Sequence, residues 1–119
     1  PLWLSPTQVR IVPISDKFTP HAQEIAETLQ ENQIRADIDD RSLTMQKKVR
    51  EAETEWINYV VVIGQRETES GILPVRDRKL REIRNMDIKQ LIHEIKKRTY
   101  GKPFQASSLP RELSKRPQF

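Results

Sequence analysis

An uninterrupted apolar run, Tyr59 to Ile63 ("YVVVI"), most constrains what this chain can fold into. Apolar residues at consecutive positions of a strand bury both of its faces, which is typical of a strand in the middle of a sheet with helices on each side. A run of this length is far too short to cross a lipid bilayer. It therefore predicts a buried central strand and no membrane span.

The residues before this run alternate between strand and helix patterns. Residues 8–14 and 34–38 are predicted strands. Between them, Thr19 and Pro20 form a typical helix start, a hydroxyl cap followed by proline at the first helical position. Apolar residues then recur at the i, i+3, i+4, i+7 spacing of one helix face, namely Ala22, Ile25, Ala26 and Leu29.

A second helix is predicted after Thr44, whose hydroxyl is placed to cap it. Its apolar stripe consists of Met45, Val49, Ala52 and Trp56. Its other face carries Lys47, Lys48, Arg50 and Glu51. The resulting order, strand-helix-strand-helix-strand, predicts three parallel strands joined by right-handed crossovers.

The residues after the apolar run break this alternation. Residues 71–76 follow after a short loop containing Gly71, which predicts an antiparallel hairpin, and residues 80–83 add a short edge strand. Asp87 and Gln90 resemble a capping box that opens a last helix. The predicted fold class is therefore α/β: a three-layer α/β/α domain with three helices and a mixed sheet of about five strands, in which a parallel β-α-β-α-β core is followed by an antiparallel hairpin.

The length of 119 residues fits one domain. We expect that domain to span residues 1–101, where the last helical pattern ends. Residues 102–119 contain three prolines and little periodicity, so they predict an extended basic C-terminal arm. The chain begins with Pro1 rather than methionine, so we expect it to be a piece of a longer protein.

The composition favours a binding module over an enzyme. There is no cysteine, which excludes disulfides, thiolate metal ligands and a thiol nucleophile. The three glycines are scattered, so neither common phosphate-binding loop is present, and neither histidine has a second ligand at metal-binding spacing. Asp37, Asp39 and Asp40 form one carboxylate cluster. A metal or acid–base role is open to it, but hydrogen bonds from Arg41 and the backbone are the favoured interpretation.

Charge is unevenly distributed along the chain. Residues 1–40 hold three basic and seven acidic side chains, whereas residues 41–119 hold 18 basic and 10 acidic ones. A basic second half suits a phosphate-rich partner. Plain solvated surface is the alternative, and charge alone does not separate the two.

Four segments carry a resemblance to a known family. They are "PLWLSPTQVRIVPISD", "IRADIDDRSLTMQKKVREAE", "YVVVIGQRETESGILPVRDR" and "MDIKQLIHEIKKR", in order and nearly without gaps over residues 1–100. Together they resemble the C-terminal anticodon-binding domain of class II aminoacyl-tRNA synthetases. The hairpin motifs Glu-x-Glu-Ser-Gly and Val-Arg-x-Arg are most similar to those of the threonine enzymes, and the tail "LPRELSKRPQF" resembles the archaeal type. Asn58 departs from the family, in which a proline commonly precedes the strand tyrosine.

The resemblance implies that this domain reads the last two bases of a threonine anticodon, G and U. Glu69 lies where the threonine enzymes place a carboxylate, whose two oxygens match the two donors on the Watson–Crick edge of guanine. Arg78 lies where they place a guanidinium that contacts the anticodon bases. The alternatives are a solvent-facing loop acid for Glu69 and a cross-strand ion pair for Arg78.

Other basic residues are candidate contacts to the tRNA backbone. Arg76 lies two residues from Arg78, so we expect it on the same side of the strand, where it holds phosphate or pairs with Glu67. The second predicted helix offers further candidate phosphate contacts, with a solvated helix face as the alternative. They are Lys47, Lys48 and Arg50.

The resemblance also implies partners. Catalysis belongs to a separate domain of the same polypeptide, which is expected to carry ATP, Mg²⁺ and zinc, and no cofactor is expected in this chain. The expected partners are that domain and the anticodon stem-loop of threonine tRNA, in a cytoplasmic enzyme that is a homodimer at full length, while the isolated domain is expected to be a monomer. Leu109, Leu113 and Phe119 are candidate apolar anchors of the arm on the catalytic domain.

Two alternatives to this function stay open. One is the anticodon-binding domain of a prolyl or histidyl enzyme, because the segments outside the hairpin fit those relatives too. The other is an α/β interaction domain that binds no RNA.

Overall fold

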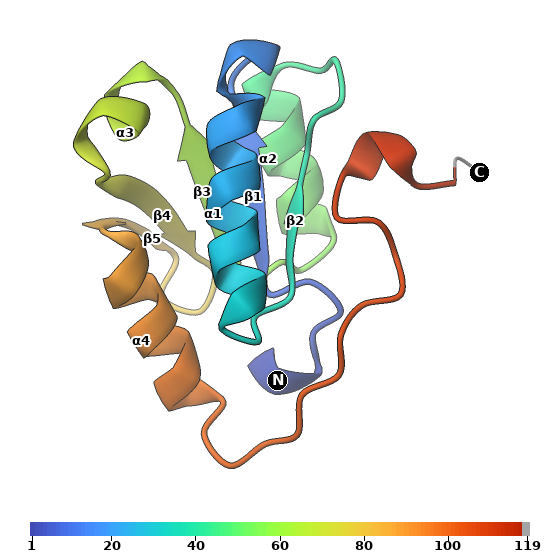
Figure 1. Ribbon diagram of the computed structural model, residues 1–119, viewed down its shortest axis with the longest axis vertical. Helices are drawn as coiled ribbons and strands as arrows, with labels where there is room; N and C mark the ends of the chain where they lie inside the picture. The colour runs from blue at the N-terminus through green and yellow to red at the C-terminus, as the bar shows by residue number, and fades with distance from the viewer. Residues whose placement is uncertain (118–119) are drawn as a thin grey trace.

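The computed structural model describes residues 1–117 and shows a five-stranded mixed sheet (Figure 1). The strands are β1 (Val9–Pro13), β2 (Ala36–Ile38), β3 (Tyr59–Ile63), β4 (Leu73–Asp77) and β5 (Glu82–Met86), in the spatial order β2-β1-β3-β4-β5. β1 pairs in parallel with β2 and β3, and β4 pairs antiparallel with β3 and β5. The predicted parallel core with an antiparallel hairpin is confirmed, and the apolar run is the central strand.

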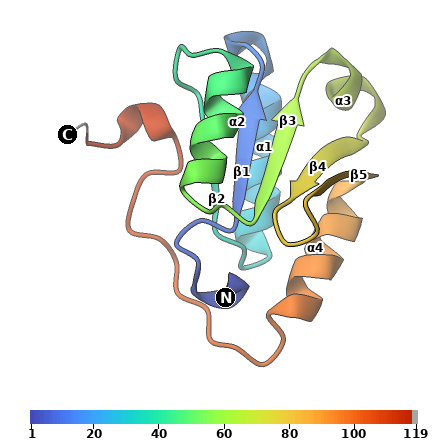
Figure 2. The same cartoon turned by 180° about the vertical axis from the view of Figure 1, so that it is seen from behind.

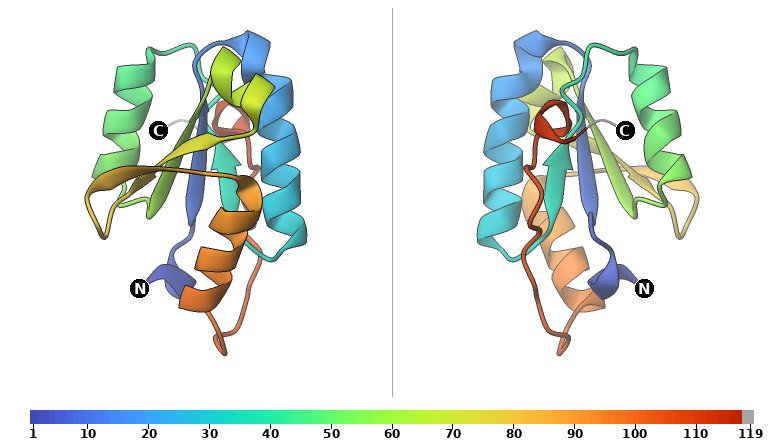
Figure 3. Two further views of the ribbon diagram at one scale, coloured as in Figure 1. Left: turned by 90° about the vertical axis from the view of Figure 1, so that its left-hand side faces the viewer. Right: turned by 90° about the vertical axis from the view of Figure 1, so that its right-hand side faces the viewer.

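The described residues form four α-helices: α1 (Thr19–Glu31), α2 (Met45–Thr54), α3 (Gln65–Ser70) and α4 (Ile88–Arg98). α1 and α4 cover one face of the sheet and α2 covers the other, which gives the predicted three layers (Figures 2 and 3). The larger hydrophobic core lies under α1 and α4. The smaller core, under α2, contains Val12, Val49, Ala52, Ile57 and Val60.

Two of the three predicted helix caps are confirmed. The Lys47 amide donates to Thr44 Oγ1 at 3.2 Å, and Asp87 and Gln90 form the reciprocal bonds of a capping box, each 2.8 Å. The predicted Thr19 cap is wrong. A 3₁₀ turn over Asp16–Phe18 leads straight into α1, so Thr19 is already helical and its hydroxyl has no capping position to occupy.

The connection between β3 and β4 is the short helix α3, where the sequence predicts a loop. The Gly64 amide donates to Glu67 Oε1 at 2.7 Å, which caps the first turn. Gly71 ends the helix with a φ of +74°, a left-handed conformation that glycine adopts without steric cost. Glu67 is therefore a capping residue in this structure and not the partner of Arg76.

The predicted apolar stripe of α2 is wrong at two positions. Trp56 lies beyond the end of the helix, with a φ of +63°, and is 71% exposed. Lys48, predicted on the solvated face, is only 4% exposed, and its Nζ donates to the Pro13 carbonyl at 3.3 Å. The stripe that faces the sheet is therefore the partly buried Met45 with the buried Lys48, Val49 and Ala52, which has the full i, i+3, i+4, i+7 spacing.

Strand boundaries also differ from the prediction: β1 spans Val9–Pro13 rather than residues 8–14, and β4 spans Leu73–Asp77 rather than residues 71–76. β2 begins at Ala36, because the Ile34 amide still bonds to the Leu29 carbonyl of the turn after α1. The edge strand β5 begins at Glu82, because residues 78–81 form the turn of the hairpin and Arg81 adopts a φ of +54° there.

The C-terminal arm returns to the domain and lies along the outer edge of β2 (Figures 1 and 2). The Ile38 amide donates to the Arg111 carbonyl at 2.7 Å, and Ile38 pairs with Glu112 in a parallel β-bridge. The Ser114 amide and hydroxyl both donate to the Asp40 carboxylate, at 2.9 and 2.7 Å. Backbone and side-chain bonds thus hold the arm to the strand edge that it covers.

The apolar residues of the arm have different surroundings. Leu113 is buried against this domain, so it is not the anchor for another domain that the sequence suggests. Leu109 is half exposed and stays a candidate anchor. Phe119 lies outside the described residues.

Candidate nucleic-acid interface

Arg78 lies at the start of the turn between β4 and β5, held against the end of α2. Its backbone amide donates to the Asn58 carbonyl at 3.0 Å. Its guanidinium lies over the Trp56 ring, with Cζ 3.9 Å from the ring centroid, and Nη1 donates to the Glu53 carbonyl at 3.3 Å. No carboxylate within residues 1–117 forms a salt bridge with it, so the predicted alternative of a cross-strand ion pair does not hold in this structure.

A cavity of about 900 Å³ opens beside this guanidinium, between the end of α2 and the β4–β5 turn. We call it the β4–β5 groove. Three apolar side chains line it, Ile57, Val60 and Ile83. Four cationic side chains line it as well, Arg76, Arg78, Lys79 and Arg81, together with the acids Glu53, Asp77 and Glu82. An apolar wall edged by cations can hold the face of a base and the phosphates beside it.

Arg76 lies within β4, opposite Val60 on one side and Ile83 on the other. It lines the same groove as Arg78, as the two-residue spacing predicts. Both side chains are therefore available to one ligand in this groove.

A network of charged side chains braces the hairpin from the opposite face of the sheet. Arg84 of β5 donates to Glu94 of α4 at 2.7 and 2.8 Å and also to Asp77 of β4. The Tyr59 hydroxyl lies 2.6 Å from Glu94 and accepts a bond from Arg98, also at 2.6 Å. The Arg84 hydrogen bonds lower the pKa of Glu94, although partial burial opposes them. These bonds join β3, β4, β5 and α4 and so hold the groove in place.

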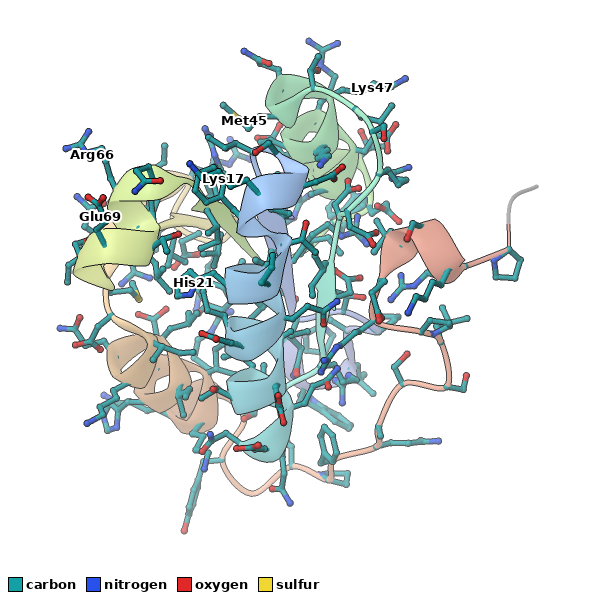
Figure 4. The ribbon with its side chains drawn as sticks, turned by 45° about the horizontal axis from the view of Figure 1, so that its top comes forward. Lys17, His21, Met45, Lys47, Arg66 and Glu69 are labelled. Carbon is teal, nitrogen blue, oxygen red and sulfur yellow. The ribbon has the colours of Figure 1, made fainter. Side chains whose placement is uncertain are left out.

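Glu69 lies at the other end of β4, in the last turn of α3, where it is exposed (Figure 4). It accepts one hydrogen bond, from Gln65 Nε2 at 2.6 Å. β4 separates it from Arg78, and the four residue steps of this strand alone span about 14 Å. The structure therefore does not bring the two predicted base-reading residues together.

The three lysine and arginine candidates on α2 have different environments. Lys47 and Arg50 are exposed, whereas Lys48 is buried and hydrogen-bonded to Pro13. Figure 4 shows Lys47, Lys17 and Arg66 at the end of the molecule where β1 and β3 end, with Lys17 between Lys47 on α2 and Arg66 on α3, which lie on opposite sides of the molecule. Lys47 and Arg50 can meet phosphate, but Lys48 cannot while its ammonium is buried.

Lys17 and Arg66 are candidates that sequence reasoning missed. Lys17 follows β1 and Arg66 follows β3, and both are exposed. The sequence did carry a signal, because the residues that follow parallel neighbouring strands meet at one edge of a sheet.

The carboxylate cluster at the end of β2 is structural, as favoured from the sequence. Asp37 accepts from Arg10, whose side chain is only 1% exposed, at 2.9 and 3.0 Å. Burial alone raises the pKa of Asp39, but hydrogen bonds and charge from Arg41 outweigh it and hold that pKa below its usual range. Within the described part of the chain, no three His, Cys, Asp or Glu side chains lie where they could jointly hold a metal ion.

No helix among residues 1–117 combines the length and the apolar character needed to cross a membrane.

Comparison with known proteins gives a consistent result at the level of sequence. Residues 8–98 match the family model described as "Anticodon binding domain". The whole chain is 45% identical to a threonine–tRNA ligase from Thermococcus sibiricus, and 99% of it is 44% identical to that of Cenarchaeum symbiosum. The chain spans only 19% of the length of each of these curated relatives.

Comparison of folds agrees with the sequences. The RNA binding domain of threonyl-tRNA synthetase from Cryptosporidium parvum matches 90% of this chain with a TM-score of 0.76 and 28% identity. The match covers 26% of that chain. The sequence match to an anticodon binding domain and the fold match to the RNA binding domain of a threonyl-tRNA synthetase therefore agree with each other.

Proposed function

Because the chain belongs to the family of anticodon-binding domains, we propose that it is the module with which a threonine–tRNA ligase recognises the anticodon of threonine tRNA. Binding positions the tRNA so that a separate catalytic domain of the same polypeptide charges its acceptor end. We assign ATP, Mg²⁺ and zinc to that domain and no catalytic step to this chain. The proposal places the full enzyme in the cytoplasm as a homodimer, with the isolated domain as a monomer.

The observation that carries the proposal is the ordered guanidinium of Arg78 beside the β4–β5 groove. Nη1 is already bonded to the Glu53 carbonyl, whereas Nε and Nη2 have no hydrogen-bond partner among residues 1–117. Nε–H and Nη2–H form a pair of nearly parallel donors. Acceptors on a base edge, such as guanine O6 or uracil O4, match such donors, and the apolar wall of the groove suits the face of the same base.

Glu69 is proposed as the second reading residue. An exposed carboxylate can accept both Watson–Crick donors of an unpaired guanine, after giving up its single bond from Gln65. Glu69 and Arg78 then approach the last two anticodon bases, G and U, from opposite ends of β4.

The remaining candidates are proposed as phosphate contacts, which add affinity without reading sequence. Arg76 supplies one such contact from within the groove. Lys47 and Arg50 supply others from α2, together with Lys17 and Arg66 at the neighbouring sheet edge. Lys48 is left out because it is buried.

Binding of this chain to anticodon stem-loops of stated sequence tests the proposal. We expect a threonine stem-loop to bind at low salt, with affinity that falls as salt is raised. A stem-loop in which the last two anticodon bases are swapped with each other should bind more weakly than the threonine stem-loop. Tighter binding of a proline or histidine stem-loop would favour the other synthetases, and no binding at low salt would favour an interaction domain that binds no RNA.

A further inference from the structure

The turn that follows α2 places a tryptophan where a glycine is usual. The Ile57 amide donates to the Ala52 carbonyl and the Trp56 amide donates to the Glu53 carbonyl, each at 3.1 Å. This pair of bonds ends a helix in the motif whose next-to-last residue is left-handed and is most often glycine. Trp56 occupies that position with a φ of +63°, which is sterically unfavourable for a residue with a Cβ. The backbone therefore gives no reason for a bulky side chain here.

Burial gives no reason for the tryptophan either. Trp56 is 71% exposed, so the core does not hold its ring. The ring instead lies under the guanidinium of Arg78, with Cζ 3.9 Å from its centroid. A guanidinium over an indole face is a favourable cation–π arrangement, and tryptophan is the best aromatic partner for it.

The end of α2 holds both residues at once. The Glu53 carbonyl accepts from the Trp56 amide at 3.1 Å and from Arg78 Nη1 at 3.3 Å. This carbonyl lies at the negative end of the helix dipole, which favours a cation beside it. The backbone bond from the Arg78 amide to Asn58 fixes the other end of the same side chain. Arg78 is therefore held at its backbone, at one guanidinium nitrogen and on one face.

We infer that Trp56 is a positioning residue for Arg78 in anticodon binding. Its ring keeps the guanidinium in place beside the β4–β5 groove before RNA arrives, while Nε–H and Nη2–H have no hydrogen-bond partner among residues 1–117 and stay available to a ligand. A free arginine side chain loses much rotamer freedom when it binds a ligand, and fixing it beforehand removes part of that cost. This inference rests on the proposed function, and it assigns Trp56 no contact with the RNA.

Trp56→Gly separates this role from a structural one. Glycine suits the left-handed position, so we expect the melting temperature to stay equal or rise. We expect affinity for the threonine stem-loop to fall about fivefold, which corresponds to the loss of one exposed cation–π contact. Trp56→Phe keeps an aromatic face and should restore most of the affinity. Tyr100→Ala, which removes an aromatic side chain that is 88% exposed elsewhere, is the control and should change neither quantity.

A double-mutant cycle with Arg78→Ala gives the decisive comparison. If Trp56 acts through Arg78, Trp56→Gly has no further effect on stem-loop affinity once Arg78 is alanine. An equal loss in both backgrounds would show that Trp56 contacts the RNA itself and would overturn the positioning role. Unchanged affinity in Trp56→Gly, with a loss in Arg78→Ala, would overturn the inference and leave the proposed function standing. Absence of stem-loop binding by the wild-type chain would overturn both.

Discussion

The two ends of β4 carry the two residues proposed to read the anticodon, and they prepare those residues differently. At one end Glu69 projects from the six-residue helix α3 with one hydrogen bond, to its neighbour Gln65. At the other end Arg78 is held by its backbone amide, by a carbonyl of α2 and by the Trp56 ring. One strand thus presents one loosely held side chain and one that is already ordered.

The difference arises from what surrounds each end. α3 is capped by Gly64 and Gly71, and none of its six residues is buried. The β4–β5 turn is enclosed by the end of α2 on one side, and Arg84 ties its strands to Glu94 of α4 on the other. A pre-ordered donor loses less entropy on binding than a free one, so we expect the Arg78 end to contribute more affinity than the Glu69 end.

The largest expected effect is that of Arg78→Ala. Loss of paired donors to a base costs about 1–3 kcal/mol, so affinity for the threonine stem-loop should fall roughly 5- to 150-fold. Arg78→Lys should not restore it, because an ammonium group lacks the planar donor pair. Fluorescence anisotropy titration measures both. Recovery by lysine would mean that Arg78 supplies only charge.

Glu69→Gln should have a smaller effect, about three- to tenfold, because the side chain is exposed and keeps one acceptor oxygen. The variant should lose affinity for stem-loops that have guanine at the second anticodon position. Its affinity for stem-loops without that guanine should change little. Glu31→Gln, an exposed acid of similar charge on α1, is the matched control. A loss larger than that of Arg78→Ala would reverse the expected order of the two ends.

Phosphate contacts should change the salt dependence more than the specificity. Each of Lys47→Ala and Arg50→Ala should lower the slope of log affinity against log salt by about 0.7, and should weaken cognate and exchanged stem-loops alike. Lys96→Ala, an exposed cation on α4, is the control and should leave the slope unchanged. A change in base preference would instead place these side chains near the bases.

The smallest expected effect concerns stability at low pH. Arg84 holds the pKa of Glu94 below its ordinary value of 4.5. A carboxyl group with a depressed folded-state pKa stabilises the fold above its unfolded pKa, and this contribution is lost as the pH falls below that value. The melting temperature of the wild type should therefore fall more steeply below pH 4.5 than that of Glu94→Gln, with Glu31→Gln as control. Parallel curves would mean that Glu94 does not brace the hairpin through its charge.

Local patterns in the sequence predict the layers of this fold well. The apolar run locates β3, and Thr44 and Asp87 mark the starts of α2 and α4, because caps and periodicity depend on residues only a few positions apart. The sequence predicts Lys48 on the solvated face of α2 because the residue is charged, although its spacing from Met45 and Val49 places it on the buried face. α3 was missed although Gly64, Glu67 and Gly71 mark its ends, because the hairpin pattern accounted for the same residues.

The features that the sequence does not predict depend on contacts between residues that are far apart in the chain. The arm is held by bonds between Ile38 and Arg111, which no local pattern predicts. Family resemblance named Arg78 and Glu69 as site residues, but it did not indicate that β4 separates them. The Trp56–Arg78 contact was hidden for a similar reason, because it needs a left-handed turn after α2 and a hairpin that returns to it.

Charging of threonine tRNA by the full-length ligase to which we propose this domain belongs tests the central claim most directly. The measurement is the ratio of kcat/KM for threonine tRNA to kcat/KM for the same tRNA with its last two anticodon bases exchanged, in the wild type and in Arg78→Ala. We predict a high ratio in the wild type that falls by about 10-fold or more in the variant, mainly through a loss with the cognate tRNA. An unchanged ratio in Arg78→Ala would contradict the account.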